Sequence, residues 1–165
     1  MNIRPENSHD IPEIRAMITA AFEGAPHSDG TEDAIVDALR AGGALTVSLI
    51  AERDDEIVGY VAFSRVEING VVVDWYGLGP IAVRTDQQRQ GIGIRPIQAG
   101  LDQIKALGAA GCVVFGDPRY YARFGFSADP ALQFPDVPPE YFQRLDFGHD
   151  ARHGVVVYHA AFYGA

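Results

Sequence analysis

The sequence predicts an α+β fold built on one mixed sheet. Strand-like segments come first, helical segments are interspersed among them, and two strand-like segments near the end of the chain suggest a closing hairpin with a long connection. This order is typical of a sheet with helices packed on its faces. At 165 residues the chain has the size of one folded unit, and we expect residues 1–165 to form a single domain.

The first part of the chain predicts a short strand and two helices. Residues 2–5 are strand-like, and residues 31–40 have apolar side chains on one helical side. Between them, residues 24–30 form a polar loop. The first helix is expected to be capped by Ser8 or Asp10 and to tolerate a proline in its first turn. Its apolar side chains recur at helical spacing: they are Ile11, Ile14, Ile18, Ala21 and Phe22.

The middle of the chain predicts three long strands. Residues 45–53 and 57–68 are rich in apolar and β-branched side chains. Asn69-Gly70 is a strong signal for a two-residue hairpin, and it leads into a third strand over residues 71–83.

The rest of the chain alternates helices and strands. We expect a long helix over about residues 90–107, a buried strand over 112–115 and a short helix over about 118–124. A proline-rich loop follows over residues 129–139. Two last strands, residues 141–147 and 155–162, are expected to close the sheet as a hairpin.

Composition limits the class of protein. The 47% hydrophobic and 21% charged content is that of a globular protein. No long apolar run and no basic-then-apolar N-terminus is present, so we expect a cytoplasmic protein with no membrane partner. The net charge of −9 disfavours a nucleic-acid partner and is compatible with a cationic amine substrate. The single cysteine, Cys112, is expected to be a buried core thiol.

Residues 80–93 are the most informative stretch. An apolar strand ends at Val83, a polar turn follows, and Gly91 and Gly93 precede a long helix. Such a turn leaves backbone N–H groups free at the positive end of a helix dipole. The stretch therefore predicts an anion site, most simply for a phosphate or pyrophosphate.

Two common phosphate loops do not match this turn. A dinucleotide-binding loop has a third glycine where this chain has Pro96, and it needs an acidic residue after a second strand. The nearest acidic residue past Pro96 is Asp102, within the helix itself. A nucleotide-triphosphate loop needs Gly-Lys-Ser/Thr, which is absent.

The pattern Gln88-x-x-Gly91-x-Gly93 resembles the acyl-CoA signature of the GNAT N-acetyltransferase family, Gln/Arg-x-x-Gly-x-Gly/Ala. Two further segments resemble the family and its YhbS-like branch. In residues 116–126, Tyr121 precedes a Gly-Phe pair by four positions, and residues 154–162 resemble the closing strand. The resemblance covers about residues 1–163.

This resemblance implies a GNAT fold, with a mixed, mostly antiparallel twisted sheet of about seven strands and about four helices. It also implies that the fourth and fifth strands splay apart, with a bulge supplied here by Gly77, Gly79 and Pro80, and that acetyl-CoA is the acyl donor. The fourth strand would pair with the pantetheine arm and the turn would hold the pyrophosphate. The residues in these roles would be Ile81, Ala82, Val83, Gln88, Arg89, Gln90, Gly91, Ile92 and Gly93.

The resemblance implies that Tyr121 is the catalytic residue, because a phenol can hydrogen-bond or protonate a leaving thiolate. With ordinary pKa values of about 10 and 8.5, complete proton transfer is uphill by roughly 2 kcal/mol. Family members often carry Glu or His at the positions of Gly77 and Gly79, so no general base is assigned. Ordered water is the expected route, with Asp74, Glu67 or His27 as groups that could act through it.

We therefore expect an acetyl-CoA-dependent enzyme that acetylates a primary amine by direct transfer, with no metal; a homodimer is implied by the resemblance alone. An alternative is a catalytically idle module that binds acyl-CoA as a sensor or interaction domain. The missing base and Pro96 suggest this alternative, since an interior proline near the start of the helix predicts a kink at residues 92–96. Arg95 either contacts a phosphate or faces solvent. Residues 24–30 and 129–139 are expected to shape the acceptor site.

Overall fold

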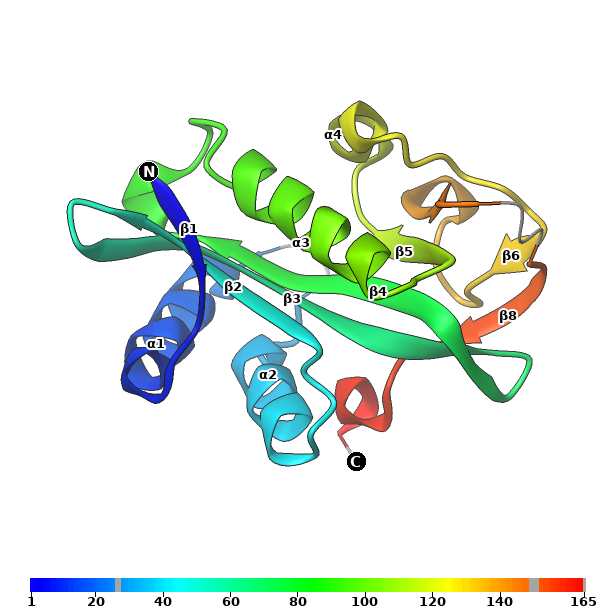
Figure 1. Ribbon diagram of the computed structural model, residues 1–165, viewed down its shortest axis with the longest axis horizontal. Coiled ribbons are helices and arrows are strands. Elements are labelled where there is room, and N and C mark those ends of the chain that lie inside the picture. Colours follow the sequence, from blue (N-terminus) through cyan, green and yellow to red (C-terminus); the bar gives the residue numbers. More distant parts are fainter. Residues whose placement is uncertain (26–27, 149–151, 165) are drawn as a thin grey trace.

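The computed structural model describes residues 1–25, 28–148 and 152–164. Within them a mixed sheet of eight strands is covered by helices on both faces (Figure 1). The main strand order is β1-β2-β3-β4-β5-β7, with β8 beside β3 and β6 beside β8. The strands are β1 (Asn2–Pro5), β2 (Val47–Arg53), β3 (Glu56–Ile68), β4 (Val71–Val83), β5 (Gly111–Phe115), β6 (Leu132–Gln133), β7 (Phe142–Asp146) and β8 (Gly154–Val157).

Four α-helices in the described part of the chain flank the sheet, as expected. α3 and α4 lie on one face, whereas α1, α2 and the C-terminal 3-10 helix lie on the other (Figure 1). α1 buries Ile14, Met17 and Ile18 against the sheet, which confirms the helical spacing of its apolar residues. The helices are α1 (Ile11–Phe22), α2 (Glu32–Ala41), α3 (Ile94–Ala106) and α4 (Pro118–Tyr121), and the C-terminal 3-10 helix is Ala160–Tyr163.

The sheet separates between β4 and β5, which confirms the expected splay. These two strands pair in parallel only where residues 75–77 face residues 111–113. β4 then continues to Val83, and β5 turns away to pair with β7. Most of the other strand pairs are antiparallel.

A bulge in β4 lies where the two strands separate. Val61 of β3 pairs with Ile81, and Phe63 pairs with Leu78, so three steps along β4 match two along β3. The extra residue falls in Gly79-Pro80, where proline has no N–H to give to a ladder. The expected bulge is therefore confirmed there, whereas Gly77 stays in a regular pair with Ser64.

The expected closing hairpin is wrong. β7 pairs with β5, whereas β8 pairs with β3 and with β6, a short strand inside the segment expected to be a loop. The Asn69 backbone N–H donates to the Val155 carbonyl oxygen at 2.9 Å, and the Val155 N–H donates to Asn69 Oδ1 at 3.0 Å. The tight β3–β4 turn thus holds β8, and this partnership has no local sequence signal. Residues 160–163 are a 3-10 helix rather than strand.

The helix after the glycine turn begins later than expected. α3 starts at Ile94, so Pro96 occupies its first turn rather than its interior. N–H groups in a first turn have no intrahelical acceptor, and proline therefore removes no bond there. The predicted kink at residues 92–96 depended on a helix start near Gly91, and that condition is not met.

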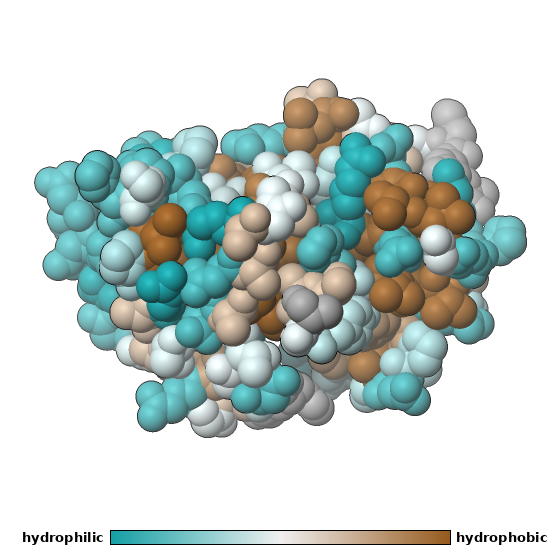
Figure 2. All heavy atoms as spheres, turned by 90° about the horizontal axis from the view of Figure 1, so that it is seen from below, coloured by the Kyte–Doolittle hydropathy of each residue, from teal (hydrophilic) through white to brown (hydrophobic). Residues whose placement is uncertain are grey.

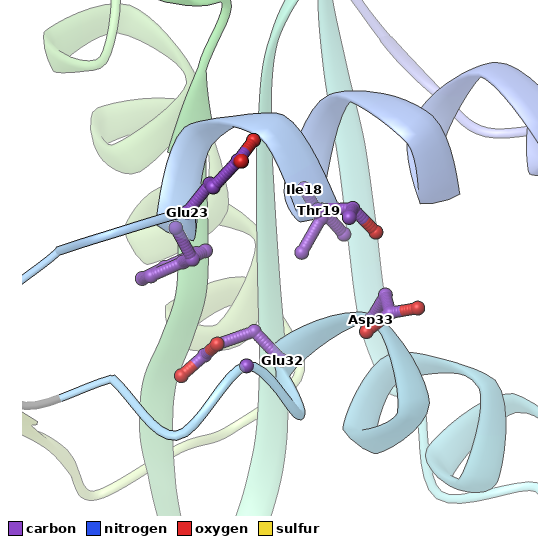
Figure 3. Close-up of a pocket in the computed structure, with 7 residues that line it drawn as sticks. Ile18, Thr19, Glu23, Glu32 and Asp33 are labelled. Atoms are coloured by element: carbon purple, nitrogen blue, oxygen red, sulfur yellow. The ribbon is translucent and has the colours of Figure 1, made fainter.

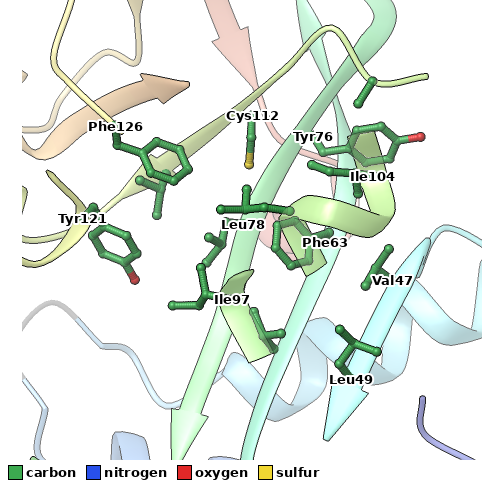
Figure 4. Packing of buried hydrophobic residues seen from close by; sticks show 14 residues of the cluster. Val47, Leu49, Phe63, Tyr76, Leu78, Ile97, Ile104, Cys112, Tyr121 and Phe126 are labelled. Atoms are coloured by element: carbon green, nitrogen blue, oxygen red, sulfur yellow. The ribbon is translucent and has the colours of Figure 1, made fainter. Parts of the chain in front are cut away.

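A dense apolar core fixes α3 on the sheet. Ile97 and Ile104 of α3 face Phe63 and Leu78 (Figure 4). At Gly100 the helix backbone touches the sheet directly, since a Cβ built there would lie 2.2 Å from Phe63 Cε1. This close approach positions the start of α3 relative to β4.

Exposed apolar side chains gather at the end of the sheet formed by the β3–β4 turn and β8 (Figure 2). Val71 and Val72 are each 60% exposed, and Val155 and Val157 are each 38% exposed. Within the described residues no helix is long and apolar enough to cross a membrane.

Gly100→Ala is expected to destabilise the protein by about 1–3 kcal/mol, because the methyl group overlaps the Phe63 ring. In an exposed helix the same change is stabilising. Chemical denaturation measures the effect. Gln103→Ala, on the exposed side of α3, is the control and is expected to change stability by less than about 0.5 kcal/mol. A Gly100→Ala protein as stable as wild type would contradict this packing.

Candidate active site

The glycine turn after β4 has the backbone geometry of an anion site. A 3-10 helix, Thr85–Gln87, follows β4, and Arg89 and Gly91 then adopt left-handed conformations with φ of 66° and 75°. This conformation is costly for most residues and free for glycine, which explains the glycine at 91. α3 starts three residues later, with Gly93 as its N-cap and no side chain capping it.

The N–H groups of the turn are directed to no protein acceptor. Among the described residues, no hydrogen bond is donated by the backbone N–H groups of residues 89–93. The Gln88 side chain instead closes the turn, since its Nε2 donates to the Val83 carbonyl oxygen at 3.1 Å. Unpaired donors at a helix N-terminus attract anions.

The edge of β4 that faces the splay is open. The Arg84 N–H donates to the Val58 carbonyl of β3 at 2.9 Å. Backbone N–H and C=O groups alternate in direction along a strand, so those of Ala82 also point to β3. The N–H and C=O groups of Ile81 and Val83 point to the opposite edge, where β4 and β5 separate. β5 pairs with β4 no further than residue 77, so it leaves this edge available to an extended ligand.

Tyr121 stands beside the splay at the end of α4. Asp117 caps this helix by accepting the Arg119 N–H at 2.9 Å. The Tyr121 ring covers Gly116, where a Cβ would lie 2.4 Å from Tyr121 Cε2, and it meets Phe126 edge-on at 5.9 Å. The side chain lies at the margin of the core (Figure 4).

The Tyr121 hydroxyl has no hydrogen-bond partner among the described residues, and its residue lines a cavity. Tyr121 is only 8% exposed, and no described protein group hydrogen-bonds its hydroxyl. Burial raises the pKa of Tyr121 well above its ordinary value. The phenol therefore stays protonated and able to donate across the neutral range.

Tyr120 links α4 to the glycine turn, a role that the sequence did not predict. A Cβ built on Gly93 would lie 3.1 Å from the Tyr120 hydroxyl oxygen. The Arg123 guanidinium lies 4.5 Å from the centre of the Tyr120 ring. Two motifs that are far apart in sequence are thus brought into contact. The one sequence signal for this contact is the pair of adjacent tyrosines. Two neighbouring helical residues cannot both face the core, so one of them has to contact something else.

Tyr158, which the sequence also did not single out, fills the space beside Gly77. A Cβ on Gly77 would lie 2.4 Å from Tyr158 Cε1, so a glutamate or histidine there would overlap this ring. Tyr158 is 7% exposed, packs against Phe134 and Phe162, and has a hydroxyl with no hydrogen-bond partner among the described residues. Burial raises its pKa.

One large cavity lies between the β4 bulge, Tyr121 and Tyr158. It has a volume of about 900 Å³ and is lined by the β4 bulge, the end of β5, Tyr121 and Tyr158. Its walls also include Phe22 and Ile35, from helices on the opposite face of the sheet to α4. The cavity therefore passes through the gap between β4 and β5. A smaller cavity of about 160 Å³ lies between α1 and α2, and both Glu32 and Asp33, from the first turn of α2, line it (Figure 3).

The other predicted candidates lie elsewhere. Asp74 pairs with Arg65 at 3.3 Å, and neither Asp74 nor Glu67 lines the large cavity. His27 falls outside the described residues. Arg95 is exposed, as one of its two expected roles required, and it donates to the Met1 carbonyl oxygen at 2.7 Å.

Cys112 is completely buried, which confirms it as a core thiol, and burial raises its pKa. No group of three or more His, Cys, Asp or Glu residues within the described parts of the chain is arranged to hold a metal ion.

Comparison with known proteins assigns the chain to a family. A family model described as an acetyltransferase (GNAT) domain matches residues 45–128. The uncharacterized N-acetyltransferase YhbS of Escherichia coli K12 is 37% identical over 170 residues, which cover 98% of each chain. The chain belongs to the GNAT acetyltransferase family.

Two solved GNAT structures have the same fold over nearly the whole chain. A GNAT acetyltransferase from Brucella melitensis, in complex with acetyl-CoA, is 48% identical, with a TM-score of 0.87 over 98% of this chain and 97% of its own. YhbS from Escherichia coli, in complex with CoA, is 34% identical, with a TM-score of 0.88 over 98% and 91%. The GNAT resemblance seen in the sequence is thereby confirmed.

Stability is expected to fall as the pH rises above about 10, the ordinary tyrosine pKa. Burial raises the pKa values of Tyr60, Tyr121 and Tyr158 in the folded protein. The contribution of these phenols to folding stability is therefore complete below the ordinary tyrosine pKa and is lost at higher pH, where the unfolded chain ionises first. Each phenol adds a slope of up to about 1.4 kcal/mol per pH unit. Denaturant unfolding at a series of pH values measures this decline, and Tyr158→Phe is expected to make it shallower. Full tyrosinate absorbance from the folded protein at about pH 10 would contradict the burial.

Proposed function

We propose that the protein transfers an acetyl group from acetyl-CoA to a primary amine. The observation that carries this proposal is the set of unpaired N–H groups at residues 89–93 beside the open edge of β4. The acetyl-CoA and CoA complexes of the two related GNAT structures support it.

The residues present suit the donor in three ways. The N–H groups of Arg89, Gln90, Gly91, Ile92 and Gly93 would hold the pyrophosphate at the start of α3. Gln88 would keep the turn closed, as its bond to the Val83 carbonyl indicates. The backbone groups of Ile81 and Val83 would pair with the amides of the pantetheine arm, while Ala82 stays bonded to β3.

The donor supplies a thioester: the amine nitrogen bonds to the acetyl carbon, the carbon–sulfur bond breaks, and the two protons lost from the ammonium end on sulfur and in solvent. Tyr121 would hydrogen-bond the sulfur as negative charge develops there. The raised pKa of Tyr121 makes complete transfer of its own proton harder than for an ordinary tyrosine. We therefore assign Tyr121 the role of a hydrogen-bond donor to the leaving group.

No side chain is proposed as general base. Gly77 and Gly79 carry none, and Tyr158 occupies the space beside Gly77. Converting a lysine-like ammonium to the free amine at pH 7 costs about 4.6 kcal/mol. Water would take this proton, with much of the rate coming from positioning in the splay.

The alternative of an idle acyl-CoA-binding module is not favoured. One argument for it was Pro96, which occupies the first turn of α3 and deletes no helical bond. The other was the missing base, but the cavity is also lined by residues of α1 and α2, on the side of the sheet opposite α4, where a second substrate would have room.

Gly91→Val is expected to weaken acetyl-CoA binding at least tenfold, because a β-branched residue disfavours φ of 75° and displaces the N–H groups of the turn. Titration calorimetry measures the dissociation constant. The matched control is Gly108→Val, which introduces the same strain at φ of 95° beyond the other end of α3. Equal affinities for the two variants would remove the turn from the donor site.

Tyr121→Phe is expected to lower kcat by roughly a hundredfold while leaving acetyl-CoA affinity unchanged, since only a hydrogen bond to the leaving sulfur is lost. Thiol release during turnover of a primary amine provides the assay. Tyr76→Phe, which alters a buried tyrosine outside the cavity, is the control. If Tyr121→Phe turns over as fast as wild type, another group stabilises the thiolate.

A further inference from the structure

We propose that the acceptor is a small primary amine with an aromatic or similarly apolar body and no negatively charged group. This inference rests on the proposed acetyl transfer and specifies its second substrate. The large cavity carries it through three features: its aromatic walls, its charge and two buried phenols.

Aromatic side chains dominate the walls. Eight of the described lining residues are aromatic, and they come from α1, the end of β5, α4, the segment between β6 and β7, and the C-terminal segment. Such walls bury an apolar body, and aromatic faces also attract an ammonium group. The eight are Phe22, Phe115, Tyr121, Phe134, Tyr141, Tyr158, Phe162 and Tyr163.

The charged groups of the walls all have one sign. Asp29, Glu32 and Asp117 line the cavity, and the described lining residues include no Lys, Arg or His. A carboxylate or phosphate on the acceptor would lose its water without gaining a cation and would meet like charges. Amino acids and phosphorylated amines are therefore disfavoured.

Glu32 is the carboxylate best placed to recognise a cation. Asp117 is already paired with Arg119 at 3.1 Å, and Asp29 accepts hydrogen bonds from Thr31. Glu32 accepts only from Ser28 Oγ, at 2.7 Å, and has no ion pair within the described residues. Its second oxygen remains available to an ammonium or another N–H donor.

Two phenols supply an independent sign of a nitrogen ligand. Tyr121 and Tyr158 are more than nine-tenths buried and line the cavity from opposite faces of the sheet, and no described group hydrogen-bonds their hydroxyls. A hydroxyl that reaches a cavity and has no protein partner can form a hydrogen bond with a ligand bound there. Tyr158 is well placed to accept from an amine N–H, while Tyr121 donates to the leaving sulfur.

The test compares four amines: phenethylamine and its para-carboxamide, para-carboxylate and para-trimethylammoniomethyl derivatives. The para groups change charge while lying far from the reacting nitrogen. With wild-type protein and acetyl-CoA, we expect kcat/KM for the carboxylate to be at least tenfold below that for the carboxamide. The trimethylammoniomethyl derivative, whose quaternary nitrogen cannot be acetylated, is expected to equal or exceed the carboxamide in kcat/KM.

Two variants test whether Glu32 causes the discrimination against the carboxylate derivative. Glu32→Gln is expected to reduce the carboxamide-to-carboxylate ratio severalfold. Asp33→Asn removes the same charge from the same helical turn but does not line the large cavity, so it is expected to keep the wild-type ratio. An equal effect of both variants would assign the selection to overall charge and overturn the role of Glu32.

The outcomes separate this inference from the proposed function. If the carboxylate derivative reacts as well as the carboxamide, the inference is wrong although acetyl transfer stands. The same holds if all four amines fail while a lysine peptide is acetylated. If acetyl-CoA binds but no amine of any kind releases thiol, the proposed function fails and this inference fails with it.

Discussion

The interruption of hydrogen bonding between β4 and β5 is the constraint on which the site depends. The parallel ladder stops at Gly77, and the bulge at Gly79-Pro80 shifts the register of β4 immediately afterwards. Beyond this point one edge of β4 carries backbone groups that β5 does not satisfy, and such groups inside a fold require partners. The cavity lies beside this edge, and the open turn follows it. A ligand with peptide-like amides could therefore form hydrogen bonds with the unpaired backbone groups of β4.

Some parts of this arrangement are determined by residues close together in the sequence and could therefore be predicted from it. The long hairpin strands, the glycine turn and the bulge followed from short patterns, because hairpin turns, proline and glycine act on the backbone within a few residues. The course of β8 did not, since its partner is set by contacts with Asn69, more than eighty residues earlier in the chain. The start of α3 at Ile94 was not predicted either. Arg89 and Gly91 adopt positive φ values that lengthen the turn, and helix propensities do not predict such backbone conformations.

Gly77 illustrates how a sequence can mislead about function. Read alone, a glycine at a position where the family resemblance leads one to expect an acid or a histidine suggests a lost catalytic group. In the structure the Tyr158 ring occupies that volume, and any side chain at 77 would displace it. The two positions therefore act as one unit, in which a small residue on β4 admits a large one from the C-terminal segment. The absence of a base on β4 is thus compatible with a complete pocket, because Tyr158 from the C-terminal segment fills the space beside Gly77.

The charge of the pocket sets a further physical requirement. Carboxylates stabilise an ammonium and oppose its deprotonation, whereas burial among aromatic rings favours the neutral amine that attacks the thioester. In this fold the two effects come from different elements. Asp29 and Glu32 belong to α2 and the loop before it, while Tyr121 and Tyr158 come from α4 and the C-terminal segment beside the splay. The proposed acceptor would be attracted as a cation by the carboxylates. Beside the phenols it would lose water, which would lower the pKa of its ammonium group, so binding and activation would not rely on the same groups.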